Sequence, residues 1–280
     1  MSLKLANSRG RAALICGERV VDLAQRSDGR FSADPMEAIA RFEEVAAFAA
    51  SVDPEDGDEP LDESALGPCV PRPQKVFGIG LNYRDHAAES GLDIPESPMV
   101  FTKFPSCLVG PRAEVVLTSN RVDWEVELVV VIGRAGSGIA ESDALDTVAG
   151  YCVGQDISDR RMQFSDKPPQ FSLGKSADTF GPLGPAVVSL DAFDDPIDLD
   201  LTCDISGQRM QKGRTRDMIF AVPELIAYLS RHCTLMPGDL IFTGTPAGVG
   251  AARNRYLSSG DEIRSCIEGI GTLVNLCVDA

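Results

Sequence analysis

The chain has 280 residues, of which 44% are hydrophobic and 24% charged, and its formal net charge is -16 at pH 7. This composition can supply a sizeable core, and the negative charge argues against nucleic acids and anionic membranes as partners. The sequence has no apolar run long enough to span a bilayer and no secretory segment at its start. We therefore expect a cytoplasmic protein.

Cysteine and histidine usage restricts the kind of metal site that the chain can build. The eight cysteines are spread out without any Cys-x-x-Cys pair, which favours buried free thiols over disulfides or zinc. Only two histidines are present, His86 and His232, so a histidine-rich zinc or iron site is nearly excluded. Any metal would be held by oxygen ligands, which favours Mg²⁺ or Mn²⁺.

Residues 1–66 predict a small N-terminal α/β domain. Strands are expected at 12–16 and 20–23, and a helix follows that Asp34 can cap, with Pro35 at its first position. The acidic segment 53–60 contains proline and glycine and indicates a linker. We place the domain boundary near it and assign residues 67–280 to a second, larger domain.

The larger part consists mostly of short strands and turns. Apolar, β-branched runs predict strands at 76–79, 114–117, 127–132, 151–154, 186–189, 201–205, 239–243, 262–267 and 272–278. Residues 268–271 join the last two as a hairpin, Ser206-Gly207 predicts a second tight turn, and a helix follows Pro223. Because strands and helices do not alternate regularly, we expect a strand-rich α+β fold.

A row of acids precedes the most apolar of these strands. In an extended segment 122–128, Asp123, Glu125 and Glu127 share one face, and the chain continues into the apolar residues 129–132. Carboxylates at the mouth of a buried strand repel one another and resist desolvation, and a divalent cation relieves both penalties. The pattern predicts a metal site; the alternative is an exposed strand edge with solvated acids. Asp123 could equally contact the metal ligands without touching the metal, or lie on the surface.

Three further segments carry candidate chemistry, each beside a simpler alternative. Asp156 follows a strand on a turn, where it could be a third ligand or only stabilise the turn. His86 and Glu89 are three residues apart, so on a helical turn the glutamate could orient a histidine base, although such pairs are common on surface helices. Lys175 lies among small residues and could stabilise an anion or be an ordinary loop lysine.

Two glycine-rich segments lack the residues of nucleotide sites. Residues 243–250 follow a strand but contain no Gly-Lys-Ser/Thr, and the segment from Gly78 has Tyr83 where a dinucleotide fingerprint needs its third glycine. We interpret the first segment as a turn that presents the Thr245 hydroxyl and backbone N–H groups to a carboxylate ligand.

In this order, the segments between residues 73 and 278 resemble the fumarylacetoacetate hydrolase family. The resemblance rests on five motifs: Gly80-Leu81-Asn82-Tyr83 with His86 and Glu89; Asp123-Trp124-Glu125-Val126-Glu127-Leu128; Asp156-Ile157-Ser158; Gly174-Lys175-Ser176 with Asp178-Thr179-Phe180; and Gly244-Thr245-Pro246-Ala247-Gly248-Val249-Gly250.

The resemblance implies a fold, a role for each site residue and a cofactor. The fold would be a mixed β-roll, commonly found as a homodimer. The metal ligands for Mg²⁺ or Mn²⁺ would be Glu125, Glu127 and Asp156; the water-activating pair His86 and Glu89; the active-site lysine Lys175; and the substrate contacts Gln163 and Thr245.

The implied activity is metal-dependent hydrolysis of a C–C bond in a 2,4-dioxo acid, such as an acylpyruvate or a fumarylpyruvate-like compound, through a metal-bound enolate. Alternatives are an isomerase, hydratase or decarboxylase of a 2-oxo acid in aromatic catabolism, such as a 2-hydroxyhepta-2,4-diene-1,7-dioate isomerase or an oxaloacetate decarboxylase, and a binding module without activity. Two departures stand out: Gln155 replaces an asparagine common in relatives, and residues 164–171 lack the tryptophan of sugar-acid members.

Overall fold

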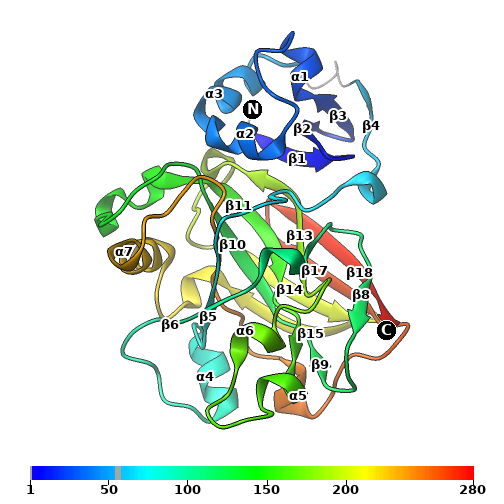
Figure 1. The fold of residues 1–280 in the computed structure, drawn as a ribbon, viewed down its shortest axis with the longest axis vertical. Helices are drawn as coiled ribbons and strands as arrows, with labels where there is room; N and C mark the ends of the chain where they lie inside the picture. Colours follow the sequence, from blue (N-terminus) through cyan, green and yellow to red (C-terminus); the bar gives the residue numbers. More distant parts are fainter. Residues whose placement is uncertain (1, 54–57) are drawn as a thin grey trace.

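One long sheet runs through the molecule and carries the N-terminal strands at one end (Figure 1). The computed structural model describes residues 2–53 and 58–280. In spatial order the strands of this sheet are β4 (Glu59–Pro60), β3 (Arg19–Asp22), β2 (Arg11–Cys16), β1 (Lys4–Ser8), β13 (Gly181–Val188), β11 (Val148–Gln155), β10 (Val126–Ile132), β16 (Leu240–Phe242), β5 (Val76–Gly80) and β6 (Met99–Thr102), with β7 (Leu108–Val109) beside β13.

A second sheet packs against the middle of the first and completes a β-roll. Its strands, in spatial order, are β15 (Gln208–Arg214), β14 (Asp200–Ile205), β17 (Glu262–Ile267), β18 (Gly271–Asp279) and β8 (Val115–Leu117). β10, β11 and β13 of the first sheet contact β14, β17 and β18 of the second. Every residue of β10 is buried as a result, as its continuous apolar run predicts. The expected strand-rich roll is confirmed.

Helices cover the ends and flanks of the roll, as Figure 1 shows, and α4, α5 and α6 gather at the end opposite the N-terminal unit. The helices are α1 (Leu23–Arg26), α2 (Pro35–Ala40), α3 (Phe42–Ala49), α4 (Arg84–Ser90), α5 (Arg160–Gln163), α6 (Phe171–Gly174), α7 (Val222–His232) and α8 (Gly250–Arg253). Short 3₁₀ turns lie at Glu63–Ala65, Pro105–Cys107, Glu141–Asp143, Leu145–Thr147, Leu190–Ala192 and Thr215–Asp217. None of the helices in the described ranges is both long and apolar enough to cross a bilayer.

The N-terminal unit joins the main sheet edge to edge. Lys4 and Leu5 of β1 pair with Val188 and Val187 of β13, so the sheet is continuous across the predicted boundary. The division into domains 1–66 and 67–280 stays a prediction. Of the predicted linker 53–60, residues 54–57 lie outside the described residues, and β4, which follows them, pairs with β3.

Several local predictions are confirmed, and one helix is shorter than expected. Asp34 caps α2 by accepting the Met36 N–H at 2.9 Å, as predicted. The helix then breaks at Arg41, whose φ of -115° lies outside the helical range and whose guanidinium donates to the Arg30 carbonyl. The result is two helices, α2 and α3, where the periodicity predicts one.

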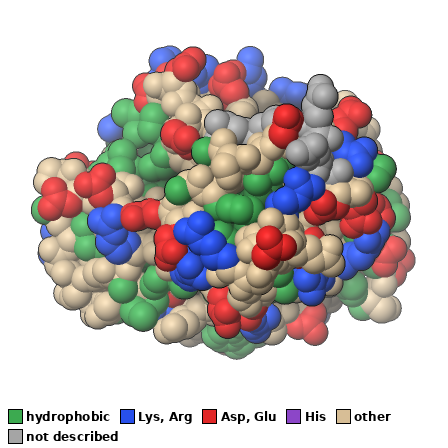
Figure 2. Space-filling model, turned by 90° about the horizontal axis from the view of Figure 1, so that it is seen from above, with side chains coloured by type: hydrophobic (Ala, Val, Ile, Leu, Met, Phe, Trp, Pro, Cys, Tyr) green, Lys and Arg blue, Asp and Glu red, His purple; other side chains and the backbone are tan. Residues whose placement is uncertain are grey.

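The cysteines are free thiols, as the sequence predicts, and charges of both signs are mixed on the face shown in Figure 2. All eight cysteines are free, and six of them are buried. Figure 2 shows the end of the molecule that carries the N-terminal unit, where Lys and Arg side chains are interspersed with Asp and Glu rather than gathered by sign.

The buried Asn82 joins three separate segments at the end of the roll where α4 lies. Its side-chain amide donates to the carbonyls of Phe220 and Thr243 at 3.1 and 2.7 Å, and its carbonyl accepts the Phe220 N–H at 2.8 Å. This places the turn between β5 and α4 beside the end of β16.

We expect Asn82→Ala to lower the free energy of unfolding by about 3 kcal/mol, because the buried backbone groups that it satisfies lose their partners. Urea unfolding followed by circular dichroism measures this difference. Asn120→Ala, at an exposed asparagine, is the matched control and should change stability little. Equal losses in the two variants would contradict the structural role of Asn82.

Candidate active site

A cavity of about 400 Å³ opens at the end of the roll where α4, α5 and α6 meet. Every residue that the sequence predicts for the site lines this cavity: His86, Glu89, Glu125, Glu127, Asp156, Gln163, Lys175 and Thr245. Segments far apart in the sequence are therefore brought together as the motif order predicts. The individual roles of these residues remain predictions.

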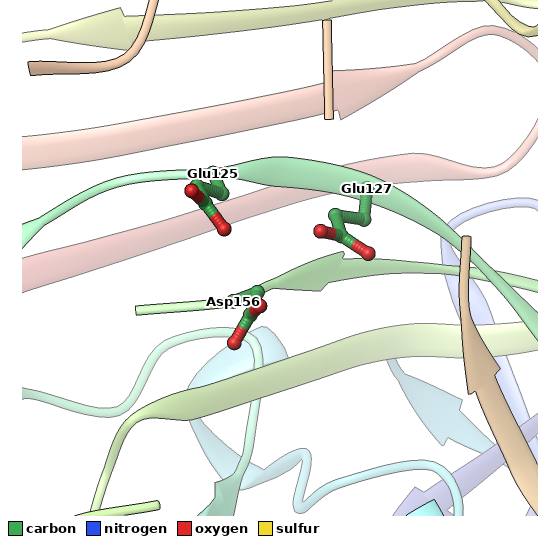
Figure 3. Close-up of side chains that lie close together, drawn as sticks. All are labelled: Glu125, Glu127 and Asp156. Atoms are coloured by element: carbon green, nitrogen blue, oxygen red, sulfur yellow. The ribbon is translucent and has the colours of Figure 1, made fainter. Parts of the chain in front are cut away.

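The three predicted metal ligands form one cluster. Glu125 precedes β10, Glu127 lies on β10, and Asp156 follows β11, which pairs with β10 in antiparallel register. The Asp156 N–H donates to the Glu125 carbonyl at 2.9 Å, which holds the two chain segments side by side. One carboxylate oxygen from each residue lies within 4.8 Å of the others, and all three residues are buried (Figure 3).

The segment 122–128 is not one continuous strand, and this separates Asp123 from the cluster. The chain forms β9 (Val122–Asp123), paired with β12 (Ser158–Asp159), and then leaves strand geometry at Trp124 and Glu125. Trp124 is fully buried, and its indole N–H donates to the Gly248 carbonyl at 3.1 Å. Asp123 accepts the N–H groups of Gly250 and Ala251 at 2.6 and 3.0 Å and stabilises the start of α8.

Three cations neutralise this buried acidic cluster. Lys175 donates to Glu125 and Asp156, both at 2.5 Å, and to the Ser158 hydroxyl at 2.8 Å. Lys103 lies 2.8 Å from Asp156, and Arg160 pairs with both Asp123 and Glu125. All of these side chains are nearly inaccessible to solvent.

Sequence reasoning identifies Lys175 but misses Lys103 and Arg160. Arg160 begins α5, and its partners Asp123 and Glu125 are 37 and 35 residues away in the sequence, so no local pattern marks it. Lys103 directly follows β6 and gives no local signal either. Its partners, Asp156 and the carbonyls of Lys175 and Phe180, are at least 53 residues away in the sequence.

The charges of the cluster are unequally compensated. Burial opposes ionisation of Glu125, but the charges of Arg160 and Lys175 outweigh it and hold the pKa of this carboxyl below its usual range. Burial raises the pKa of Glu127, and the charges of Asp156 and Glu125 raise it further. In the described part of the chain Glu127 has no ion pair, and it accepts the Gly244 N–H at 2.8 Å.

The donor set fits a hard divalent cation. Glu125, Glu127 and Asp156 offer carboxylate oxygens only, which is the chemistry that Mg²⁺ and Mn²⁺ prefer. A cation bound there would also supply the positive charge that Glu127 lacks. The buried triad can therefore bind such a metal.

His86 and Glu89 on α4 form the expected pair. Nδ1 of His86 lies 3.0 Å from Oε1 of Glu89, and both oxygens of Glu89 accept the Gly248 N–H, at 2.9 and 3.0 Å. Burial alone would raise the pKa of Glu89, but the hydrogen bonds from His86 and Gly248 bring it below its ordinary value. An ionised Glu89 can accept a hydrogen bond from Nδ1–H of His86, and in that tautomer the lone pair of the ring lies on Nε2.

The glycine-rich loop 243–250 binds carboxylates of the protein itself. Its backbone N–H groups donate to Glu127 from Gly244, to Glu89 from Gly248 and to Asp123 from Gly250. The N–H groups of Gly244, Gly248 and Gly250 therefore bind buried acids of three other segments, and the interpretation that this segment presents its hydroxyl and N–H groups to a carboxylate ligand stays a prediction.

Gln163 and Thr245 line the cavity but already have partners within the protein. The Gln163 carbonyl accepts from Arg160 at 2.9 Å. The Thr245 hydroxyl donates to the Val126 carbonyl at 2.8 Å and accepts from the Gln211 amide at 2.7 Å. Their contact with a substrate stays a prediction.

Comparison with known proteins places this site in a family. Residues 75–278 match the model of the fumarylacetoacetate (FAA) hydrolase C-terminal domain. The human mitochondrial oxaloacetate tautomerase FAHD2A is 46% identical over 223 residues, covering 78% of this chain and 71% of that protein.

Two solved structures extend the likeness to the whole chain. A candidate HpcE protein from Mycobacterium smegmatis superposes with a TM-score of 0.94 at 46% identity and covers 99% of this chain and 100% of its own. The maleylpyruvate hydrolase of Sphingobium sp. SYK-6, in complex with manganese(II) and pyruvate, gives 0.84 at 30% identity with 99% and 100% coverage. The protein thus belongs to the fumarylacetoacetate hydrolase family.

Proposed function

We propose that the protein is a divalent-metal-dependent hydrolase that cleaves a C–C bond in a 2,4-dioxo acid. The observation that carries this proposal is that a histidine–glutamate pair and a buried carboxylate triad line one cavity. The first can activate water, and the second can hold a cation that attracts an anionic 2-oxo acid. The maleylpyruvate hydrolase relative, whose structure contains manganese(II) and pyruvate, supports the same assignment.

The substrate would enter with its 2-oxo-acid end toward the buried inner end of the cavity. Arg160 and Lys175 lie there and favour the anionic end electrostatically. When bound by the triad, the metal would draw electron density from the carboxylate and keto oxygens of that end. The distal carbonyl would then lie on the side of the cavity that His86 and Glu89 line.

The residues of the chain supply the proton transfers. Nε2 of His86 removes a proton from water, and the resulting hydroxide adds to the carbonyl at C4. The C3–C4 bond breaks, its electron pair forms the enolate across C2 and C3, and the proton on His86 passes to C3. The products are pyruvate and the carboxylic acid of the acyl group. The ammonium of Lys175 stabilises the negative charge that develops on the enolate oxygen.

A second candidate is an enol–keto tautomerase or isomerase of a 2-oxo acid. The 46% identity to an oxaloacetate tautomerase favours it. The same residues would serve, since His86 can move a proton to or from C3 without any attack by water. The two reactions differ in their products, because only hydrolysis releases pyruvate and a second acid.

The primary test is a panel of 2,4-dioxo acids with Mg²⁺ or Mn²⁺ and with a chelator. We expect loss of the enol absorbance together with release of pyruvate, and we expect the chelator to abolish both until excess metal is added. Enol loss without pyruvate, or rapid ketonisation of enol-oxaloacetate alone, would favour the tautomerase instead. Full activity in the presence of the chelator would contradict the metal requirement.

Glu127→Ala tests the metal site without relying on turnover. Because this variant removes one of three ligands, we expect Mn²⁺ affinity to fall at least roughly 10-fold, measured by electron paramagnetic resonance of free Mn²⁺. Glu262→Ala, at an exposed glutamate of β17, is the matched control and should bind Mn²⁺ as the unchanged protein does. Equal affinity in the two variants would place the metal elsewhere.

His86→Ala tests the base. We expect kcat on a confirmed 2,4-dioxo acid to fall on the order of 10²–10⁴-fold, because general base catalysis is lost, while Mn²⁺ binding is retained. The other histidine provides the control: His232 is exposed at the end of α7, and His232→Ala should retain full activity. Unchanged turnover in His86→Ala would remove this residue from the mechanism.

A further inference from the structure

The outer half of the cavity is apolar, in contrast to its charged floor. The floor residues Glu125, Asp156 and Lys175 are buried, whereas Leu92 and Phe164 at the mouth are 59% and 57% exposed. Eight further apolar side chains line the cavity: Ile79, Leu81, Met99, Phe101, Phe171, Val249, Ala251 and Ala252. A substrate bound on the floor would therefore extend its distal part along an apolar wall.

Two glycines of β5 leave space for the side chains of β6 that form part of this wall. Phe101 and Met99 of β6 pair with Gly78 and Gly80 of β5. A Cβ at either glycine would lie 2.3 Å from the side chain of its partner, so the absence of side chains lets Phe101 and Met99 lie flat over β5. Phe101 also contacts Phe171 edge to face, with the ring centroids 5.8 Å apart.

Phe101 marks the point where the floor ends and the wall begins. The Lys175 ammonium lies 5.0 Å from the centre of the Phe101 ring, on the floor side. Farther out, the wall consists of aromatic and aliphatic side chains, and some of them, such as Met99, are partly exposed to solvent. An apolar acyl group would cover this surface and remove it from water.

The charges along the cavity disfavour a second carboxylate at that position. Among the described residues that line the cavity, Arg160 and Lys175 are the cations, and both are paired with Glu125 on the floor. Outside the triad, the remaining acid that lines the cavity is Glu89, whose pKa the hydrogen bonds from His86 and Gly248 keep low and whose charge would repel a distal acid. A dicarboxylic substrate would thus lose solvation of its far end without gaining a cationic partner.

We propose that the outer wall is an acyl pocket for a neutral, apolar group, so that the preferred substrates are 2,4-dioxo acids with an alkyl or aryl acyl group. This inference rests on the proposed function for the reaction, but it concerns the part of the ligand beyond the 2-oxo acid. It sets this chain apart from the maleylpyruvate hydrolase relative, whose name denotes a substrate with a second carboxylate.

The first arm of the test measures binding and is independent of turnover. The probes are 2-oxoheptanoate and 2-oxoadipate, which share the 2-oxo-acid end and nearly the same length but differ in the charge of the far end. Isothermal titration calorimetry with the Mg²⁺-loaded protein should give at least about 10-fold tighter binding of 2-oxoheptanoate. Equal or tighter binding of 2-oxoadipate would overturn the acyl pocket.

The second arm places a cation in the wall. Phe164→Arg changes an exposed residue at the mouth, and we expect it to reduce the preference for 2-oxoheptanoate by about 10-fold. Leu276→Arg, at a position of β18 with 46% exposure, introduces the same charge outside the cavity lining and should keep the original preference. The same shift in both variants would attribute the effect to net charge and overturn the pocket.

The third arm separates this inference from the proposed function by comparing pyruvate release from hexanoylpyruvate and fumarylpyruvate. A higher kcat/KM for hexanoylpyruvate supports both proposals. A higher value for fumarylpyruvate leaves the hydrolase in place and overturns the apolar acyl pocket. No pyruvate from either compound, with 2-oxoheptanoate still bound more tightly, overturns the hydrolase and retains the pocket.

Discussion

The burial of four carboxylates at one end of the roll is the constraint on which the rest of the structure depends. Asp123, Glu125, Glu127 and Asp156 are all nearly inaccessible to solvent, because two packed sheets enclose the segments that carry them. Each buried charge costs several kcal/mol unless it is paired. The cations that compensate them come from three different segments, at Lys103, Arg160 and Lys175, so the acidic cluster holds β6, α5 and the end of α6 together.

The same constraint explains the glycine-rich loop between β16 and α8. Its backbone N–H groups reach Glu127, Glu89 and Asp123, which come from a buried strand, a surface helix and the two-residue strand β9. Gly248 must approach closely: a Cβ there would lie 2.1 Å from the Met210 carbonyl, and its φ of +109° is one that side chains rarely adopt. One loop thereby fixes the position of the His86–Glu89 pair on α4 relative to the carboxylate triad.

This arrangement accounts for the range of reactions among the relatives. Hydrolases and tautomerases are both found among them, and an enolate of a 2-oxo acid is common to both chemistries. A buried triad with adjacent cations can stabilise the negative charge of such an enolate in either reaction. Under the proposed function, the outcome would depend on whether water or a carbon-bound proton reaches His86. Substrate preference would then be set by lining residues such as Phe101 and Phe164 rather than by the carboxylate triad.

The sequence by itself determined most strands of the roll and most candidate residues of the site. Alternating and continuous apolar runs predicted most strands, since side-chain burial leaves a local periodic pattern. The family resemblance named eight residues that line the cavity, but it did not name Arg160. The prediction places the start of β13 too late, because Pro182 and Pro185 argue against a strand. It misses β15, because the sequence of that strand is too polar to be recognised. Only the tertiary structure decided the roles of Lys103 and Asp123 and the continuity of the sheet from β1 to β13. These depend on partners far away in the chain, and charge compensation at that range leaves no trace in local sequence.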